Sequence, residues 1–142
     1  MPTSATTIEY KHNHPLDPLD VARVFDASGI KRPTADLPRI ARMFAGANLI
    51  ISAWHDARLV GVSRSLTDFS YCCYLSDLAV DRQWQGRGIG TALMVQTKAA
   101  AVGEFGDGVR CILLSAPAAI EFYEKVGLER HPNCFDFTNL NG

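Results

Sequence analysis

The segment from Tyr74 to Met94, YLSDLAVDRQWQGRGIGTALM, constrains the fold of this chain most strongly. Its first part, LSDLAV, is apolar enough for a buried strand, and the glycine-rich run QGRGIG follows soon after. After Gly90, apolar residues recur at three- to four-residue spacing, which predicts a helix. A glycine-rich turn at a helix N-terminus points backbone N–H groups into one concavity, beside the partial positive charge of the helix. The segment therefore predicts a site for an anion, most naturally a phosphate or pyrophosphate.

Two common phosphate-binding motifs do not fit this turn. A P-loop needs a Gly-Lys-Ser/Thr run, and the chain has none. The dinucleotide fingerprint Gly-x-Gly-x-x-Gly fails in both possible registers, because its last position falls on Thr91 or on Leu93. The pattern that does fit is Gln-x-x-Gly-x-Gly, formed by Gln85, Gly88 and Gly90.

A second segment strengthens this pattern. Residues 118–128 read AAIEFYEKVGL, close to the pattern A-x-x-F-Y-x-K-x-G-F, with Leu128 where Phe is more usual. Together the two segments resemble the GNAT superfamily of N-acetyltransferases, well over about residues 49–131 and only in the order of elements before that. The resemblance implies an α/β GNAT fold. In it, a mixed, mostly antiparallel sheet of about six or seven strands is flanked by about four helices, and a splayed strand pair binds coenzyme A.

The same resemblance implies acetyl-CoA as the co-substrate. The strand backbone would pair with the pantetheine arm, with the Val80 N–H donating to the thioester carbonyl. Backbone N–H groups of the turn would hold the pyrophosphate, with Arg87 adding charge, although Arg87 could equally be a solvated surface residue. The implied coenzyme-binding residues are Leu78, Ala79, Val80, Gln85, Gly86, Arg87, Gly88, Ile89, Gly90, Thr91, Phe122 and Tyr123.

The resemblance also implies the catalytic groups. Tyr123 is the expected general acid, because a phenol can donate a proton to a leaving thiolate of similar basicity. Asp77 is the candidate general base. The alternatives are a structural Asp77 with a water on the Ser76 side as the base, or no dedicated base at all. Because side chains alternate along a strand, Ser76 and Asp77 face opposite sides unless a β-bulge intervenes. The sequence leaves this choice open.

Composition and charge limit the number of domains, the possible partners, the location and the metal sites of the protein. We expect a single domain over residues 1–142, large enough for its own core. The net charge of −1 gives no attraction for nucleic acid, and no apolar run is long enough to span a membrane. The N-terminus lacks the apolar core of a secretory signal, which favours a cytoplasmic protein. The four cysteines and four histidines do not have the spacing of a zinc site, so we expect no metal and reduced thiols.

The remaining pattern is that of a mixed α/β chain. Asp17 and Gly29 are the expected start and stop signals of the first helix. Strands are predicted at residues 8–12, 49–54, 59–65, 71–80 and 109–115, the last as a central strand, with one or two more within 128–138. Helices are predicted at residues 18–28, 35–44, about 90–102 with a stop at Gly103, and 119–126.

The acceptor is the least defined part of this interpretation. A compact, near-neutral domain favours the primary amine of a small molecule or a peptide. The two quoted segments are also similar, much less specifically, to the plastid and cyanobacterial arylalkylamine/lysine acetyltransferase branch. Residues 134–138 are a candidate homodimer contact, since homodimers are common in the superfamily. The alternative function is a non-catalytic acyl-CoA-binding sensor or interaction module.

Overall fold

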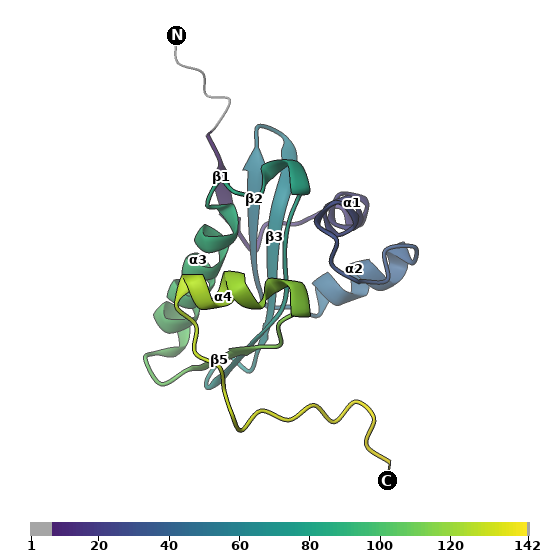
Figure 1. The fold of residues 1–142 in the computed structure, drawn as a ribbon. Coiled ribbons are helices and arrows are strands. Elements are labelled where there is room, and N and C mark those ends of the chain that lie inside the picture. The colour runs from purple at the N-terminus through teal and green to yellow at the C-terminus, as the bar shows by residue number, and fades with distance from the viewer. Residues whose placement is uncertain (1–6, 142) are drawn as a thin grey trace.

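The computed structural model describes residues 7–141, which form one five-stranded sheet with helices on its faces (Figure 1). The strands lie in chain order, antiparallel except for the parallel pair β4 and β5. Their bounds are β1 (Glu9–His12), β2 (Leu49–His55), β3 (Arg58–Thr67), β4 (Cys72–Val80) and β5 (Arg110–Leu113). The helices are α1 (Pro18–Ser28), α2 (Leu37–Ala45), α3 (Ile89–Phe105) and α4 (Ile120–Val126). The predicted α/β fold is therefore confirmed, with fewer strands than expected. Residues 1–6 and 142 of the predicted single domain lie outside the described part.

Two hydrophobic clusters cover the two faces of the sheet. The cluster under α1 and α2 contains Phe25 and Ile40, both fully buried against strand residues such as Val62. The cluster under α3 contains Ile89 and Leu93, packed against strand residues of the opposite face. Figure 1 shows α3 on one side of the sheet and the α1–α2 pair on the other. The central strands β2, β3 and β4 are thus packed on both faces, which gives a rigid support for a site built on them.

Local signals in the sequence explain where the first helices begin and end. The Asp17 side chain accepts a hydrogen bond from the Leu19 N–H at 2.9 Å, and Asp36 accepts from the Arg39 N–H at 3.1 Å. Gly29 ends α1 with φ of 85°, a left-handed conformation that suits glycine. The predicted cap and stop of the first helix are confirmed.

A β-bulge interrupts the pairing of β3 with β4. Arg64 pairs with Asp77, but the next residue, Ser65, pairs with Leu75, so that Ser76 is the extra residue of β4. The bulge meets the condition under which the Ser76 and Asp77 side chains face the same side of the sheet. Both side chains lie together on the α1–α2 side, where each contacts the Arg64 guanidinium.

Three predictions about the C-terminal half were wrong. Helix α3 passes through Gly103 and ends at Phe105, since an exposed glycine weakens a helix without stopping it. The 109–115 run forms a four-residue strand, and β5 lies at the edge of the sheet, where Ile112 and Leu114 are exposed. No strand forms in residues 128–141, because the tail runs away from the sheet and finds no ladder partner among the described residues (Figure 1). These differences account for five strands in place of six or seven.

No helix within residues 7–141 combines the length and the apolar character needed to cross a membrane.

Candidate active site

The edge of β4 that faces β5 is open over half of its length. The two strands pair from Cys72 to Leu75, and β5 then ends, leaving residues 76–80 without a strand neighbour on that edge. The Asp81 N–H donates to the Val60 carbonyl on the β3 side, so by alternation the N–H groups of Leu78 and Val80 point toward the open edge. The splayed strand pair that the sequence predicts is present in this form.

A glycine-rich loop stands at the end of this open edge. Gly86 and Gly88 have φ of 78° and 83°, and a Cβ at either position would meet nothing within 4 Å. The first hydrogen bond of α3 runs from the Ala92 N–H to the Gly88 carbonyl. The N–H groups of residues 89–91 therefore have no acceptor inside the helix and are the donors of its first turn. An anion at this position would meet backbone donors and the positive end of a 17-residue helix.

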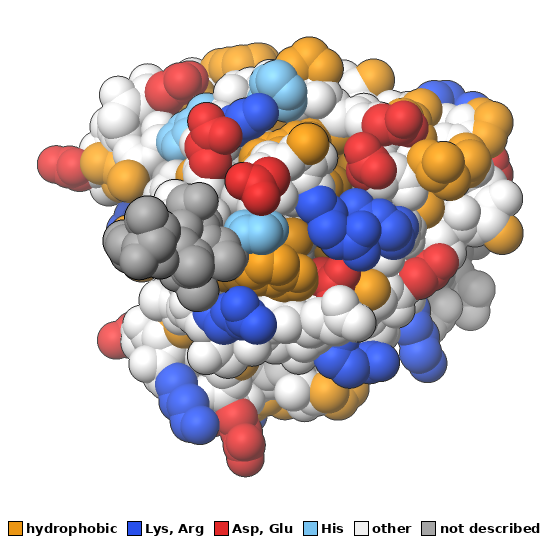
Figure 2. Space-filling view, turned by 90° about the horizontal axis from the view of Figure 1, so that it is seen from above, with side chains coloured by type: hydrophobic (Ala, Val, Ile, Leu, Met, Phe, Trp, Pro, Cys, Tyr) orange, Lys and Arg blue, Asp and Glu red, His pale blue; other side chains and the backbone are white. Residues whose placement is uncertain are grey.

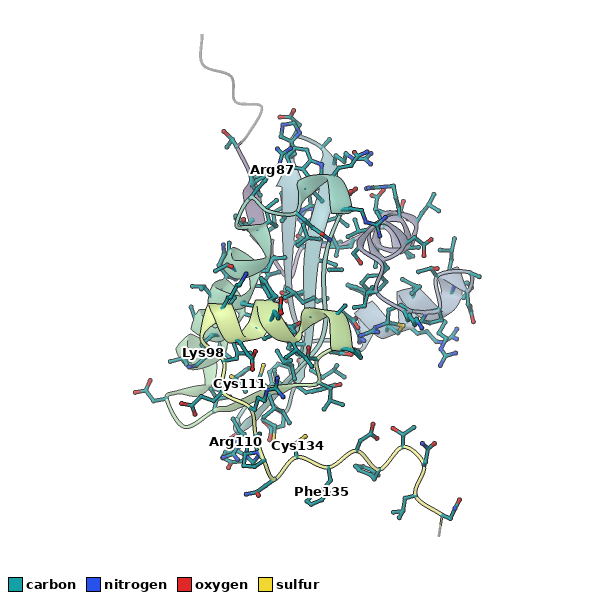
Figure 3. The ribbon with its side chains drawn as sticks, viewed as in Figure 1. Arg87, Lys98, Arg110, Cys111, Cys134 and Phe135 are labelled. Carbon is teal, nitrogen blue, oxygen red and sulfur yellow. The ribbon has the colours of Figure 1, made fainter. Side chains whose placement is uncertain are left out.

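Side chains around the loop hold it in this conformation. Asp81 accepts from the Gln83 N–H at 2.9 Å, and the Gln85 amide donates to the Val80 carbonyl at 2.9 Å. The Arg87 guanidinium lies 4.6 Å from the centre of the Trp84 ring, at the start of α3 (Figure 3). Seen from this end of the molecule, basic side chains lie on more than one side of an exposed hydrophobic area (Figure 2). Gln85 thus positions the loop through its side chain, and Arg87 remains available to a bound anion.

Helix α4 closes the site from the other side. A Cβ on Gly90 would lie 3.1 Å from the Phe122 ring, so any larger residue would push α4 away from the start of α3 by a few tenths of an ångström. The rings of Phe122 and Tyr123 form a T-shaped pair with centroids 5.2 Å apart. Burial raises the pKa of the Tyr123 phenol above its ordinary value of 10.0, and the nearby Arg32 guanidinium offsets part of this rise. The phenol therefore stays protonated at neutral pH.

Asp77 lies fully buried between two arginines. Its Oδ1 accepts from Arg32 Nε at 2.5 Å, and its Oδ2 accepts from Arg64 Nε. Arg32 also donates to the Ser76 carbonyl at 2.8 Å, and Arg64 to the Ser76 hydroxyl at 3.0 Å. The bulge, the aspartate and both guanidinium groups thus form one hydrogen-bonded cluster beside the open edge. We call these four residues, Arg32, Arg64, Ser76 and Asp77, the Asp77 cluster.

The structure brings the predicted residues together and adds two that the sequence analysis missed. The Phe122 ring lies against Gly90, and the Gln85 amide reaches the Val80 carbonyl. Tyr123 lies near Arg32 of the Asp77 cluster. The sequence around Arg64 could have indicated its role, because a charged residue within the apolar run LVGVSRSL requires a buried partner. Nothing in the sequence around Arg32 indicates such a role, since a Lys-Arg-Pro turn is typical of a solvent-exposed loop. Within residues 7–141, no group of His, Cys, Asp and Glu side chains is placed to hold a metal ion.

The Asp77 cluster predicts a large effect on stability. Replacing Asp77 with Asn removes the charge that two guanidinium groups share, and breaking such a buried pair costs about 3–5 kcal/mol. Urea unfolding should show this loss for Asp77→Asn. The control Asp20→Asn removes only an exposed ion pair with Arg23 and should change stability by about 0.5 kcal/mol or less. Equal unfolding midpoints for the two variants would contradict this role of Asp77.

Solved structures share this fold at low sequence identity. A protein of unknown function from meticillin-resistant Staphylococcus aureus matches with a TM-score of 0.78 and 17% identity, over 89% of this chain and 93% of that one. A GNAT-family acetyltransferase from Streptococcus pneumoniae matches with a TM-score of 0.69 and 23% identity, over 87% and 88%. An aminoglycoside acetyltransferase from an uncultured soil metagenomic sample, in complex with sisomicin, matches with a TM-score of 0.67 and 18% identity, over 96% and 99%.

Sequence comparison identifies the family. No curated protein matches the chain, so the predicted likeness to the arylalkylamine/lysine branch stays a prediction. The family model of the GNAT acetyltransferase domain matches residues 22–140, which include the glycine-rich loop, the Asp77 cluster and α4. The chain belongs to the GNAT acetyltransferases, acyltransferases that use acetyl-CoA.

Proposed function

We propose that the protein transfers the acetyl group of acetyl-CoA to a primary amine of a small molecule or peptide, by direct attack in a ternary complex. The observation that carries this proposal is the open edge of β4, with the glycine-rich loop at one end and the Asp77 cluster, which has a protonated tyrosine near its Arg32, at the other. A non-catalytic acyl-CoA binder would need the loop but not the tyrosine.

The open edge suits the pantetheine arm of the coenzyme. The pyrophosphate would bind the N–H groups of residues 86–91, with Arg87 at its edge, and the arm would run back along residues 78–80. Because Val80 is nearest to the loop, its N–H suits an amide of the arm. The Leu78 N–H lies further along the edge, next to the Asp77 cluster, and is the better donor to the thioester carbonyl. This proposal assigns the thioester carbonyl to the Leu78 N–H, in place of the Val80 N–H that the family resemblance implies.

The chemistry then follows from the groups present. The neutral amine nitrogen attacks the thioester carbonyl, the new C–N bond forms, and the C–S bond breaks. The electron pair of that bond leaves with sulfur, and Tyr123 donates its phenolic proton to the thiolate. The proton lost by the amine passes to water, which also returns a proton to the tyrosine. A backbone N–H at the carbonyl oxygen stabilises the charge that develops there.

Asp77 is less suited to act as the base than sequence analysis expected. Both of its carboxylate oxygens accept hydrogen bonds from guanidinium groups, and its side chain has no solvent exposure. We propose that Asp77 positions Arg32 and the bulge, and that a water on the Ser76 side removes the amine proton. Asp77 as the base stays a prediction until its variants are measured.

We further propose that the whole chain acts as one domain in a reducing compartment, the cytoplasm. All four cysteines, at positions 72, 73, 111 and 134, are free thiols, as expected there. The net charge of −1 gives no reason to expect a nucleic-acid partner.

A homodimer through β5 and the tail is the third part of the proposal. Strand β5 is an open edge with exposed Ile112 and Leu114, and the tail exposes Phe135, Phe137 and Leu140 by 77–86%. Figure 3 shows Arg110 and Cys111 on β5 and the tail carrying Cys134 and Phe135 away from the body. The tail of a second copy, placed along β5, would cover both apolar surfaces.

If the protein is a dimer through the tail, substitutions in the tail should lower its mass in solution. Wild-type protein should sediment at twice its monomer mass of 15.5 kDa, whereas the double variant Phe135→Asp, Phe137→Asp should sediment as a monomer. Leu19→Asp, on an exposed position of α1, is the control and should remain dimeric. A wild-type monomer, or a double variant that still dimerises, would contradict the proposal.

The loop predicts a loss of coenzyme binding. Gly88→Glu places a side chain at φ of 83° and a negative charge among the phosphate donors, so acetyl-CoA binding should become undetectable by calorimetry. The control Gly103→Glu introduces the same side chain at an exposed position of α3, the helix that follows the loop. This variant should bind acetyl-CoA with normal affinity. Unchanged affinity in Gly88→Glu would remove the loop from the coenzyme site.

If Tyr123 is the general acid, its replacement should reduce the turnover rate. Tyr123→Phe should lower kcat about 10²-fold and leave coenzyme affinity nearly intact, because it removes only the proton donor. Since burial raises the pKa of Tyr123, the wild-type rate should be lost through this group only above its ordinary pKa of 10.0. Tyr71→Phe, at an exposed tyrosine outside the site, is the control. A Tyr123→Phe rate equal to that of Tyr71→Phe would exclude Tyr123 as the acid.

A further inference from the structure

The charges of the Asp77 cluster do not cancel. Two guanidinium groups, Arg32 and Arg64, share the single carboxylate of Asp77, which leaves one positive charge in excess. Tyr123, whose phenol lies near Arg32, is neutral, because burial raises its pKa. A half-buried excess charge is unfavourable unless an anion accompanies it.

Arg32 is the arginine that can meet such an anion. Its side chain is 26% exposed, compared with 9% for Arg64. A guanidinium has five N–H donors, and three of those of Arg32 are used by Asp77, the Ser76 carbonyl and the Lys31 carbonyl. Two donors remain. They are held in place by the three bonds already made, so little side-chain entropy is lost when they bind a ligand.

Arg32 lies where the acceptor would approach, and away from the loop proposed to bind the coenzyme phosphates. It donates to the carbonyl of Ser76, the first β4 residue beyond the pairing with β5. The glycine-rich loop lies at the other end of the open edge, after Val80. The thioester end of the coenzyme would therefore approach Arg32, and the amine that attacks it would come from the same side.

We propose that the acceptor is an amine that also carries a carboxylate, and that Arg32 binds this carboxylate and sets substrate preference. The inference rests on the proposed function and names the substrate class of the same site. A carboxylate matches the planar guanidinium and supplies the missing negative charge. A polycationic amine would add positive charge where the protein already has an excess, which is unfavourable in a partly desolvated site.

The test compares matched acceptors with wild-type protein. Release of free coenzyme A is measured with α-amino acids, with ω-amino acids, with the carboxamides of both, and with peptides that have a free or an amidated C-terminus. A polyamine and an aminoglycoside complete the panel. A hydrogen-bonded ion pair of this kind corresponds to about a 10- to 100-fold effect on affinity. We expect kcat/KM to be higher by this factor for at least one carboxylate acceptor than for its carboxamide, mainly through KM.

Variants of Arg32 assign the preference to this side chain. Arg32→Gln should bring the ratio of carboxylate to carboxamide kcat/KM close to one, and Arg32→Lys, which keeps the charge, should retain part of it. Arg39→Gln, at an exposed position of α2, is the matched control and should keep the wild-type ratio. Because a ratio within one variant is compared, a partial loss of folded protein does not affect the result.

The outcomes separate the two proposals. Transfer to amines without preference for carboxylates, or a preference that Arg32→Gln retains, overturns this inference alone. Absence of transfer to every amine, in a protein that binds acetyl-CoA, overturns the proposed function and this inference with it.

Discussion

The ion pair of Asp77 with Arg32 and Arg64 is the interaction on which the site depends. Neither arginine could lie against the sheet without the carboxylate, and the carboxylate could not be buried without them. Arg32 comes from the connection between α1 and α2, Arg64 from β3, and Asp77 from β4. One buried carboxylate therefore fixes the position of the α1–α2 connection relative to the strand that borders the proposed coenzyme site.

The bulge at Ser76 is the backbone counterpart of this ion pair. It places the Ser76 and Asp77 side chains together and coincides with the point where β4 loses β5 as its neighbour. Beyond this point, backbone donors of β4 face an open edge, which in a soluble protein is usually paired or covered. Here the edge leads directly to the glycine-rich loop and the first turn of α3. An extended ligand with a phosphate at one end fits this combination, and the chain belongs to the GNAT acetyltransferases.

The parts of this structure that could be predicted from sequence are those set by local chemistry. Gln85, Gly88 and Gly90 lie in a strand–turn–helix segment whose conformation depends mainly on neighbouring residues, and the caps at Asp17 and Gly29 are equally local. The mixed, mostly antiparallel sheet followed from the family resemblance, although β5 lies at the edge of the sheet and not at its centre. The Asp77 cluster could not be predicted, because Arg32 and Asp77 are 45 residues apart and meet only after the sheet and the α1–α2 pair have packed. One or two short strands were predicted within residues 128–138, but a strand also needs a partner, and within residues 7–141 this segment has none.

The position of the coenzyme is the central claim, and a crystal structure of the protein with acetyl-CoA tests it most directly. The pyrophosphate should accept hydrogen bonds from backbone N–H groups of residues 86–91. The pantetheine arm should lie along residues 78–80 of β4, with the thioester end between Tyr123 and the Asp77 cluster. A coenzyme bound elsewhere, or one whose thioester points away from Tyr123, would contradict both the site and the mechanism.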